Sequence, residues 1–187
     1  MGFALAAEAA ARGAEVVLIA GPVKLDTPHS AIRRIDVTSA DEMNRAVQNE
    51  FPHSDITIMA AAVADFTPVT IAPEKIKKQG KEVPEIRLKP TADILSGLGS
   101  SKRPNQILGG FALETEQEES NAIKKLKNKN LDFIVLNSLK DEGAGFGYET
   151  NKITLYFSNG KKRTFGLKMK SAVASDILDS VEDLIKK

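Results

Sequence analysis

Short apolar runs alternate with helix-like segments along most of this chain of 187 residues. Most of these runs are nearly continuous, as in strands that are buried on both faces of a parallel sheet, whereas the second, IRRIDV, carries charged residues. The runs lie at 15–20, 32–37, 56–63, 106–113 and 132–136. Helices are expected at 2–12, 38–50, 93–98 and 116–129, with Thr38 or Ser39 as the N-cap of the second and Asp93 as an N-cap of the third. This alternation predicts an α/β fold, with a Rossmann-like, doubly wound and mostly parallel sheet and helices on both faces.

The C-terminal part of the sequence changes pattern. Segments 152–157 and 162–167 flank Ser158-Asn159-Gly160-Lys161, in which Asn-Gly is a signal for a hairpin turn. A last helix begins near Ser171. We expect a C-terminal β-hairpin extension of the sheet and a single domain over 1–187. A doubly wound fold normally begins with a strand and a Gly-rich phosphate turn, so this domain, which opens in a helix, reads as truncated at its N-terminus.

The composition excludes several kinds of functional site. Without cysteine there is no disulfide, thiol nucleophile or cysteine-ligated zinc, and two histidines are too few for a histidine metal site or a Ser-His-Asp triad. A formal net charge of +1 gives no general attraction to nucleic acid or to an anionic membrane. No apolar run approaches the roughly 20 residues that span a bilayer, and nothing resembles a signal peptide. We expect a cytoplasmic protein that binds neither nucleic acid nor membrane.

A run of small residues at 60–66, AAAVADF, and the lysine cluster at 75–78 mark the candidate site. The alanines stand at the end of a predicted strand, where ligands of open α/β sheets bind and where small side chains let a ligand approach the backbone. The lysines follow in a long loop predicted over 66–83, before a short strand at 85–89. A loop of this length inside a domain is usually functional or mobile. The small-residue floor and the cations suit a phosphate ester, and best of all a nucleoside triphosphate.

Seven segments in order resemble the phosphopantothenoylcysteine synthetase family, over essentially the whole chain. They are MGFALAAEAAARGAEVVLIAGPV at 1–23, AAVADF at 61–66, APEKIKK at 72–78, TADIL at 91–95, GFALET at 110–115, KNLDFIVLN at 129–137 and GFGYETN at 145–151. In most bacteria this family forms the C-terminal half of a bifunctional protein of coenzyme A biosynthesis, fused to a flavin-dependent decarboxylase. The resemblance implies a ligase that joins 4'-phosphopantothenate to L-cysteine through an acyl-cytidylate, using CTP and releasing CMP and pyrophosphate.

The resemblance also implies cofactors and partners. Mg²⁺ is expected as cofactor, with its ligands unassigned, and CTP as co-substrate. FMN is expected only if the natural protein is fused to the decarboxylase. The protein is expected to be a homodimer, and the terminal hairpin is a plausible contact between the two copies.

By analogy with the family, a set of positions is expected to bind the nucleotide. They are Met59, Ala60, Ala61, Asp65, Lys75, Ala92, Asp93, Ile94, Leu95, Phe111, Lys125 and Lys129. Lys75 is expected to be catalytic, as a point cation for charge that develops at the α-phosphate. Ala62 is expected to contact substrate and Phe111 to pack on the base, and Lys125 and Lys129 point from one helical face. The loop 66–83 would close as a flap over the intermediate.

The sequence departs from the family pattern at two places. Family members carry a Gly-Gly-Thr turn and an Asn-x-Ser-Ser-Gly segment just before the Met-Gly-Phe start, and often Asn-Pro where this chain has Thr91-Ala92. We therefore expect the chain by itself to be inactive. One alternative is an NAD(P)-binding Rossmann oxidoreductase. The absence of a G-x-G-x-x-G motif after a strand in this sequence argues against it. Another is a non-catalytic, dimeric nucleotide-binding domain.

Overall fold

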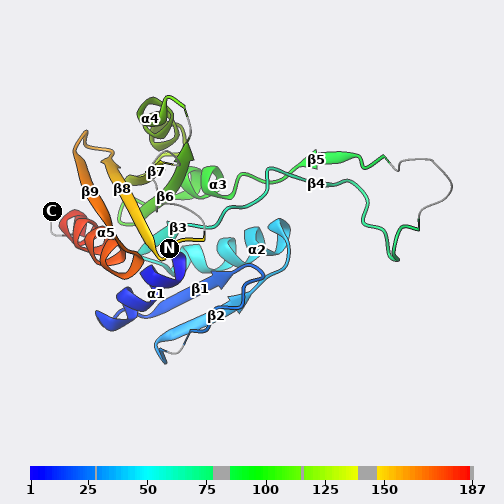
Figure 1. The fold of residues 1–187 in the computed structure, drawn as a ribbon, viewed down its shortest axis with the longest axis horizontal. Helices are drawn as coiled ribbons and strands as arrows, with labels where there is room; N and C mark the ends of the chain where they lie inside the picture. Colours follow the sequence, from blue (N-terminus) through cyan, green and yellow to red (C-terminus); the bar gives the residue numbers. More distant parts are fainter. Residues whose placement is uncertain (28, 78–84, 115, 139–146, 186–187) are drawn as a thin grey trace.

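The computed structural model describes residues 1–27, 29–77, 85–114, 116–138 and 147–185. Its helices are α1 (Gly2–Ala11), α2 (Ala40–Glu50), the short 3-10 helix η1 (Phe51–His53), α3 (Ile94–Ser101), α4 (Glu118–Asn128) and α5 (Lys170–Ile185). Its strands are β1 (Val16–Ala20), β2 (Ile32–Asp36), β3 (Ile56–Met59), β4 (Phe66–Pro68), β5 (Leu88–Pro90), β6 (Ile107–Glu114), β7 (Phe133–Ser138), β8 (Thr150–Phe157) and β9 (Lys162–Met169). Figure 1 shows a body that holds most of these elements and an arm, built on β4 and β5, that projects from it.

The central sheet has the strand order β3-β6-β7-β8-β9. Its first three strands are parallel, and β8 and β9 are added antiparallel as a hairpin. A second, two-stranded parallel sheet is formed by β1 and β2. The predicted α/β fold, with a mostly parallel sheet and a C-terminal hairpin extension, is therefore confirmed. Gly160 takes a φ of 83° in the hairpin turn, a conformation that glycine adopts without strain.

Two hydrophobic cores lie on opposite faces of the central sheet. One packs α2, α3 and α4 against side chains such as Leu108 and Ile134, and the other packs α1 and α5 against Phe133 and Val135. These strand residues alternate along β7, because successive side chains of a strand point to opposite faces. The predicted helices on both faces are thus confirmed, and the carboxyl ends of β3, β6 and β7 share one edge of the sheet (Figure 1).

Side-chain caps begin two of the helices where the sequence predicts them. Ser39 caps α2 by accepting a hydrogen bond from the Glu42 amide, and the Glu42 carboxylate accepts one from the Thr38 amide. This bond and the Thr38 hydroxyl hold the pKa of Glu42 below its ordinary value. Asp93 caps α3 through the Ser96 amide. Because a cap depends on residues three or four apart, sequence alone locates it well.

Three predicted boundaries around the candidate site are wrong. The strand expected over 56–63 ends at Met59, because its ladder with β6 stops at the Met59–Gly110 pair and the following alanines leave the sheet. The region expected to be loop over 66–83 begins with β4, and the strand expected at 85–89 is β5 at 88–90, with which β4 pairs. The strand expected over 106–113 continues to Glu114, so Phe111, expected near its carboxyl end, lies inside β6. All three depend on pairing between distant segments, which local patterns do not encode.

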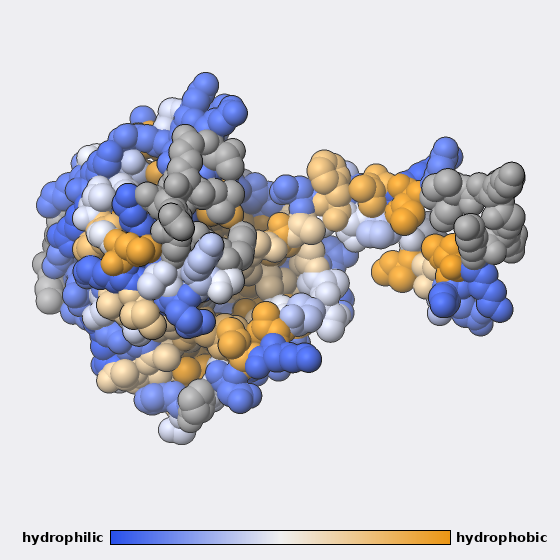
Figure 2. All heavy atoms as spheres, viewed as in Figure 1, coloured by the Kyte–Doolittle hydropathy of each residue, from blue (hydrophilic) through white to orange (hydrophobic). Residues whose placement is uncertain are grey.

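The arm exposes apolar side chains to solvent. They are Phe66, Val69, Ile71, Ile76, Ile86 and Leu88. Ile71 keeps 83% of its surface exposed, and Figure 2 shows several apolar patches along the arm. Apolar surface gathered in this way usually marks an interaction site. None of the helices within the described residues combines the length and the apolar character needed to cross a membrane.

Candidate active site

A step in the sheet edge forms the floor of the candidate site. The β3 strand ends at Met59, opposite Gly110, whereas β6 continues to Glu114. Ala60 and Ala61 leave β3 at this step, and Ala61 is exposed. The N-terminal end of α1 meets the same place, since an ideal Cβ on Gly2 would lie 3.8 Å from the Ala60 Cβ. The strand end and the start of α1 therefore lie side by side, an arrangement that suits a phosphate-bearing ligand.

Thr91 joins the two ends of the arm to each other at the base of the arm. Its amide donates to the Asp65 carbonyl at 2.9 Å, and its hydroxyl donates to the Ala64 carbonyl at 2.6 Å. Both bonds close the base of the β4–β5 ribbon and hold the alanine run next to the start of α3. The predicted positions at 59–65 and 92–95 are thereby brought together. Thr91 itself was not among the expected site residues, although it stands where the family pattern is broken.

The start of α3 is packed closely on β6. An ideal Cβ on Gly110 would lie 2.7 Å from the Leu95 Cδ2, so glycine at this position lets the Leu95 side chain reach the strand. Ile94 is buried in the core beneath the helix, while Ala92 and Asp93 remain exposed above it. The first turn of α3 therefore presents its cap and its free amides to the site, on a rigid support.

Two lysines, Lys125 in α4 and Lys129 directly after it, form ion pairs with carboxylates of the site. Lys129 forms an ion pair with Asp93 at 2.8 Å, and Lys125 forms one with Glu114 at 2.6 Å. Burial alone would raise the pKa of Asp93, but the hydrogen bonds from Lys129 and Ser96 and the charges of the two lysines lower its pKa overall. Each lysine is held near the sheet edge by a carboxylate and keeps donors for a second anion. Glu114 was not predicted, because a half-buried glutamate in a strand has no distinguishing sequence pattern.

Phe111 lies on the opposite face of the sheet from the two lysines. Its partly buried ring packs against the core that α1 and α5 cover, while Glu114 and Lys125 meet on the α3–α4 side. The side chain of Phe111 therefore cannot contact the same ligand atoms as Lys125 and Lys129. A nucleotide that reaches all three must cross the edge at the step, where β3 has ended and β6 beyond Gly110 is paired only with β7 among the described strands.

The structure does not bring Lys75 to the other predicted residues. It is exposed in the segment that follows β4, which Figure 1 shows running outward along the arm. Ala62 and Asp65 are exposed at the base of the arm, close to the step. Lys77 is exposed on the arm as well, and Lys78 lies outside the described residues. The loop 66–83 expected to act as a flap is therefore seen, as far as residue 77, extended away from the body.

The acidic residues of the site fit a magnesium ion that is held mainly by phosphate. No group of three or more His, Cys, Asp or Glu side chains in the described residues could form a protein-only metal site. Mg²⁺ commonly uses one or two carboxylates together with substrate phosphates and water. Asp65, exposed beside the alanine run and without an ion pair to any described residue, has the position and the chemistry of such a ligand.

Comparisons with known proteins agree with this geometry. The model of the DNA/pantothenate metabolism flavoprotein C-terminal domain family matches residues 1–185. The chain is 48% identical over 186 residues to the coenzyme A biosynthesis bifunctional protein CoaBC of Bacillus subtilis, covering 100% of this chain and 45% of that protein. It is 54% identical over 185 residues to a protein of an unknown prokaryotic organism named cysteine/cysteine sulfinic acid decarboxylase, covering 99% of this chain and 51% of that protein.

A solved structure shows the same fold at high similarity. The crystal structure of the C-terminal domain of CoaBC matches with a TM-score of 0.81 and 37% identity, over 99% of this chain and 83% of that one. The chain spans about half the length of the curated relatives that it matches. Because the family model and these relatives cover nearly all of its residues, the chain belongs to the DNA/pantothenate metabolism flavoprotein C-terminal domain family.

Proposed function

We propose that this domain is the ligase part of coenzyme A biosynthesis, which joins 4'-phosphopantothenate to L-cysteine using CTP. The observation that carries the proposal is the convergence of Ala60–Ala61, the α3 N-terminus, Lys125 and Lys129 at one edge of the sheet. Small residues, free helix amides and two cations are the elements that hold a triphosphate. Relatives named for coenzyme A biosynthesis support the same reaction class.

In the first step, a carboxylate oxygen of 4'-phosphopantothenate attacks the α-phosphorus of CTP. A new P–O bond forms, the bond to the β-phosphate oxygen breaks, and pyrophosphate leaves, so that an acyl-cytidylate remains. Lys125 and Lys129 would offset phosphate charge, each exchanging part of its contact with Glu114 or Asp93 for the anion. Asp65 would help to hold a Mg²⁺ ion, which would supply positive charge for the departing pyrophosphate.

In the second step, the amine of cysteine attacks the acyl carbon. The C–N bond of the amide forms, the bond from the acyl carbon to the phosphate oxygen breaks, CMP leaves, and the amine gives up a proton. Water would hydrolyse the mixed anhydride if it reached the intermediate. Closure of the arm would exclude that water and bring Lys75 to the α-phosphate during the first step.

Binding and single-turnover measurements on the natural full-length protein test this proposal. Isothermal titration should detect CTP binding and no NAD binding, and CTP with 4'-phosphopantothenate should release pyrophosphate before cysteine is added. We expect Lys75→Ala to slow that release by roughly 100- to 1,000-fold, as for loss of one preorganised charge contact. Lys77→Ala removes a lysine from the same exposed arm and should change the rate of pyrophosphate release by less than about threefold. Failure to bind CTP would sink the proposal, and NAD binding would support the oxidoreductase alternative.

We also infer that the protein forms a homodimer through its arm. A two-stranded ribbon alone is marginally stable, and this one exposes Phe66, Ile71, Ile86 and Leu88. These apolar side chains favour the arm over the terminal hairpin as the contact, because the outer strand of that hairpin carries two lysines and an arginine. Sedimentation should give a dimer, and Ile71→Lys with Ile86→Lys should give a monomer. A wild-type monomer at tens of micromolar would exclude this inference.

Location and fusion remain part of the same proposal. We infer that the reaction takes place in the cytoplasm. FMN would be required only by a decarboxylase domain, which would belong to the same polypeptide or act beside it. The relatives named bifunctional, of which this chain covers less than half, support the fusion.

A further inference from the structure

Thr91 connects the two ends of the arm through its side chain as well as through its main chain. Its amide donates to the Asp65 carbonyl at 2.9 Å and continues the row of bonds between β4 and β5. Any residue except proline could supply that bond. The Thr91 hydroxyl donates to the preceding carbonyl, that of Ala64, at 2.6 Å, across 27 residues of chain. This second bond needs a short side chain with a donor at position 91.

The arm has little else that fixes its direction. β4 and β5 are three residues each, and Pro68 and Pro90 bring no amide to their ladder. A two-stranded ribbon of this kind is marginally stable by itself. Phe66 and Leu88 are 59% and 57% exposed, so the apolar side chains of the ribbon are not packed on the body (Figure 1). Among the described residues of 64–91, only the Thr91 side chain forms a hydrogen bond with another described residue.

The body side of Thr91 is a rigid support. Two residues later, Asp93 caps α3 through the Ser96 amide and pairs with Lys129 at 2.8 Å. The buried side chain of Ile94 anchors the same turn in the core. The Thr91 hydroxyl therefore ties the first residues of the arm to the start of α3. Together with the amide bond it makes a second point of attachment, and two points fix the direction in which the ribbon leaves the body.

This direction matters because the arm carries Lys75. Lys75 lies on the segment that runs outward from β4, and it forms no ion pair or hydrogen bond with a described residue (Figure 1). A small rotation at the base of the arm displaces the segment far along it much more than it displaces the base. A reacting group that is misplaced by about 1 Å can cost roughly 100-fold in rate.

We propose that Thr91 is a positioning residue for the first step of the reaction. Its hydroxyl sets the direction of the arm, and so the place to which Lys75 is delivered when the arm closes. This rests on the proposed function. Thr91 acts without touching the nucleotide, since its hydroxyl proton is bonded to Ala64. Because that bond is exposed to water, its loss should change the stability of the fold little and the delivery of Lys75 much.

Single-turnover release of pyrophosphate by the natural full-length protein tests this proposal in a double-mutant cycle. Thr91→Val keeps the shape and the amide bond but loses the hydroxyl, and should slow release by roughly 10- to 100-fold. In a Lys75→Ala background the same substitution should change release by less than about threefold, because the group that it misplaces is gone. Thr91→Ser keeps the donor and should stay within about threefold of wild type.

Thr67→Val is the matched control. Thr67 lies in β4 of the same ribbon, and its hydroxyl forms no hydrogen bond with a described residue. Its replacement should leave the rate of pyrophosphate release within about threefold of wild type. A Thr67→Val variant as slow as Thr91→Val would mean that any change in the ribbon slows the step, and would overturn the specific role of Thr91.

CTP titration and thermal unfolding separate positioning from other roles. Thr91→Val should bind CTP within about threefold of wild type and unfold within a few degrees of it. Equal slowing with and without Lys75, no slowing, slow release by Thr91→Ser, or much weaker CTP binding would each overturn the inference. If Thr91→Val does not fold, Thr91→Ala decides by the same comparison, and two unfolded variants would show a structural role instead.

The same measurements distinguish failure of this inference from failure of the ligase proposal. A Lys75→Ala variant as fast as wild type would overturn the positioning role of Thr91 together with the role of Lys75. CTP binding and pyrophosphate release by wild type would then still support the ligase. Absence of CTP binding in wild type would overturn both.

Discussion

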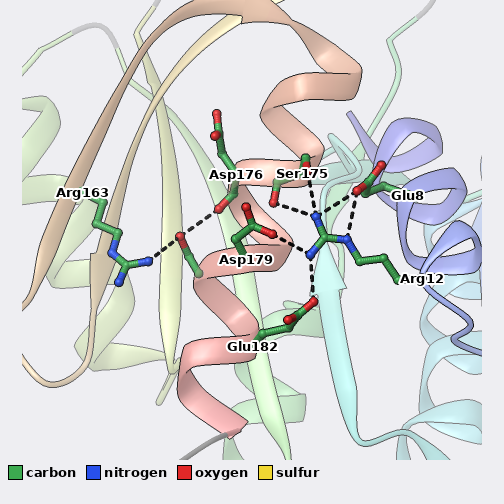
Figure 3. Close-up of polar contacts among 8 residues, drawn as sticks. Glu8, Arg12, Arg163, Ser175, Asp176, Asp179 and Glu182 are labelled. Carbon is green, nitrogen blue, oxygen red and sulfur yellow. Dashed lines mark hydrogen bonds and ion pairs between the residues drawn. The ribbon is translucent and has the colours of Figure 1, made fainter.

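Arg12 is expected to fasten α1 to α5, and its removal should destabilise the domain measurably. Its guanidinium forms ion pairs with Glu8 at 2.9 Å, Asp179 at 2.7 Å and Glu182 at 2.8 Å, and it donates to the Ser175 hydroxyl at 2.7 Å (Figure 3). The hydrogen bonds to Glu182, Asp179 and Glu8 raise the pKa of Arg12 above its ordinary value. These contacts, the Arg12 clamp, matter for the attachment of α1, because this helix is rich in alanine and the one large side chain that it buries is Leu5.

The size of the effect follows from the exposure of the partners. The Arg12 side chain is 26% exposed, but Asp179 and Glu182 are 64% and 45% exposed, so water screens much of the attraction. Three such pairs at roughly 0.2–1 kcal/mol each suggest that Arg12→Met costs about 1–3 kcal/mol. For a domain of this size the corresponding loss of Tm is about 2–12 °C. Arg12→Lys should lie between wild type and Arg12→Met, because an ammonium cannot match the planar fork of donors.

Urea unfolding at low and high salt is the assay. The cost of Arg12→Met should shrink in 1 M NaCl, where the Debye length falls to about 3 Å. Arg33→Met, which removes one exposed ion pair with Glu50, is the matched control and should cost less than about 1 kcal/mol. If the two variants cost the same, or if salt leaves the difference unchanged, the clamp does not hold α1 in the way that Figure 3 indicates.

Two further predictions concern packing and pH. Gly109→Ala should destabilise the fold by about 1–3 kcal/mol in urea unfolding, because the new Cβ would lie 2.1 Å from the buried Phe133 ring. Gly166→Ala, with nothing within 4 Å, should be nearly neutral, and equal effects of the two would refute this account. Asp93→Ala should cost about 1 kcal/mol at pH 7 through loss of the α3 cap. Because folding lowers the pKa of Asp93, that contribution is present above its unfolded value near 4 and lost as pH falls through the lower folded value, so the difference from wild type should shrink progressively in more acidic solution. A difference that persists there would contradict the lowered pKa, and Asp93→Ser, which keeps a cap, is the control.

Much of the architecture can be read from local pattern. The apolar runs that became β1, β6 and β7, the caps at Ser39 and Asp93, and the Asn-Gly hairpin turn are all found where the sequence predicts them. Each depends on residues within one turn or one strand, whose spacing and chemistry are visible in a single window. The layer order follows, since alternating strands and helices have few ways to bury their apolar faces.

The arrangement of the site was less accessible from sequence. Lys125 and Lys129 could be placed on one face of α4 from their spacing, but their pairing with Glu114 and Asp93 could not. Phe111 could be placed in a strand, but its face relative to the lysines depends on register, and a shift of one residue would reverse it.

The sequence by itself determined the layers of this protein, the chemistry available at its strand ends and the helix caps. Only the tertiary structure decided that β3 stops at Met59, that Thr91 closes the base of the arm, that Lys75 lies away from the body, and that the oxygen of Asn137 has no partner among the described residues. The physical reason is the same in each case. Periodicity and capping act over a few residues. Strand ends, hydrogen bonds between segments and unpaired atoms are instead set by which distant segments come into contact and where that contact ends.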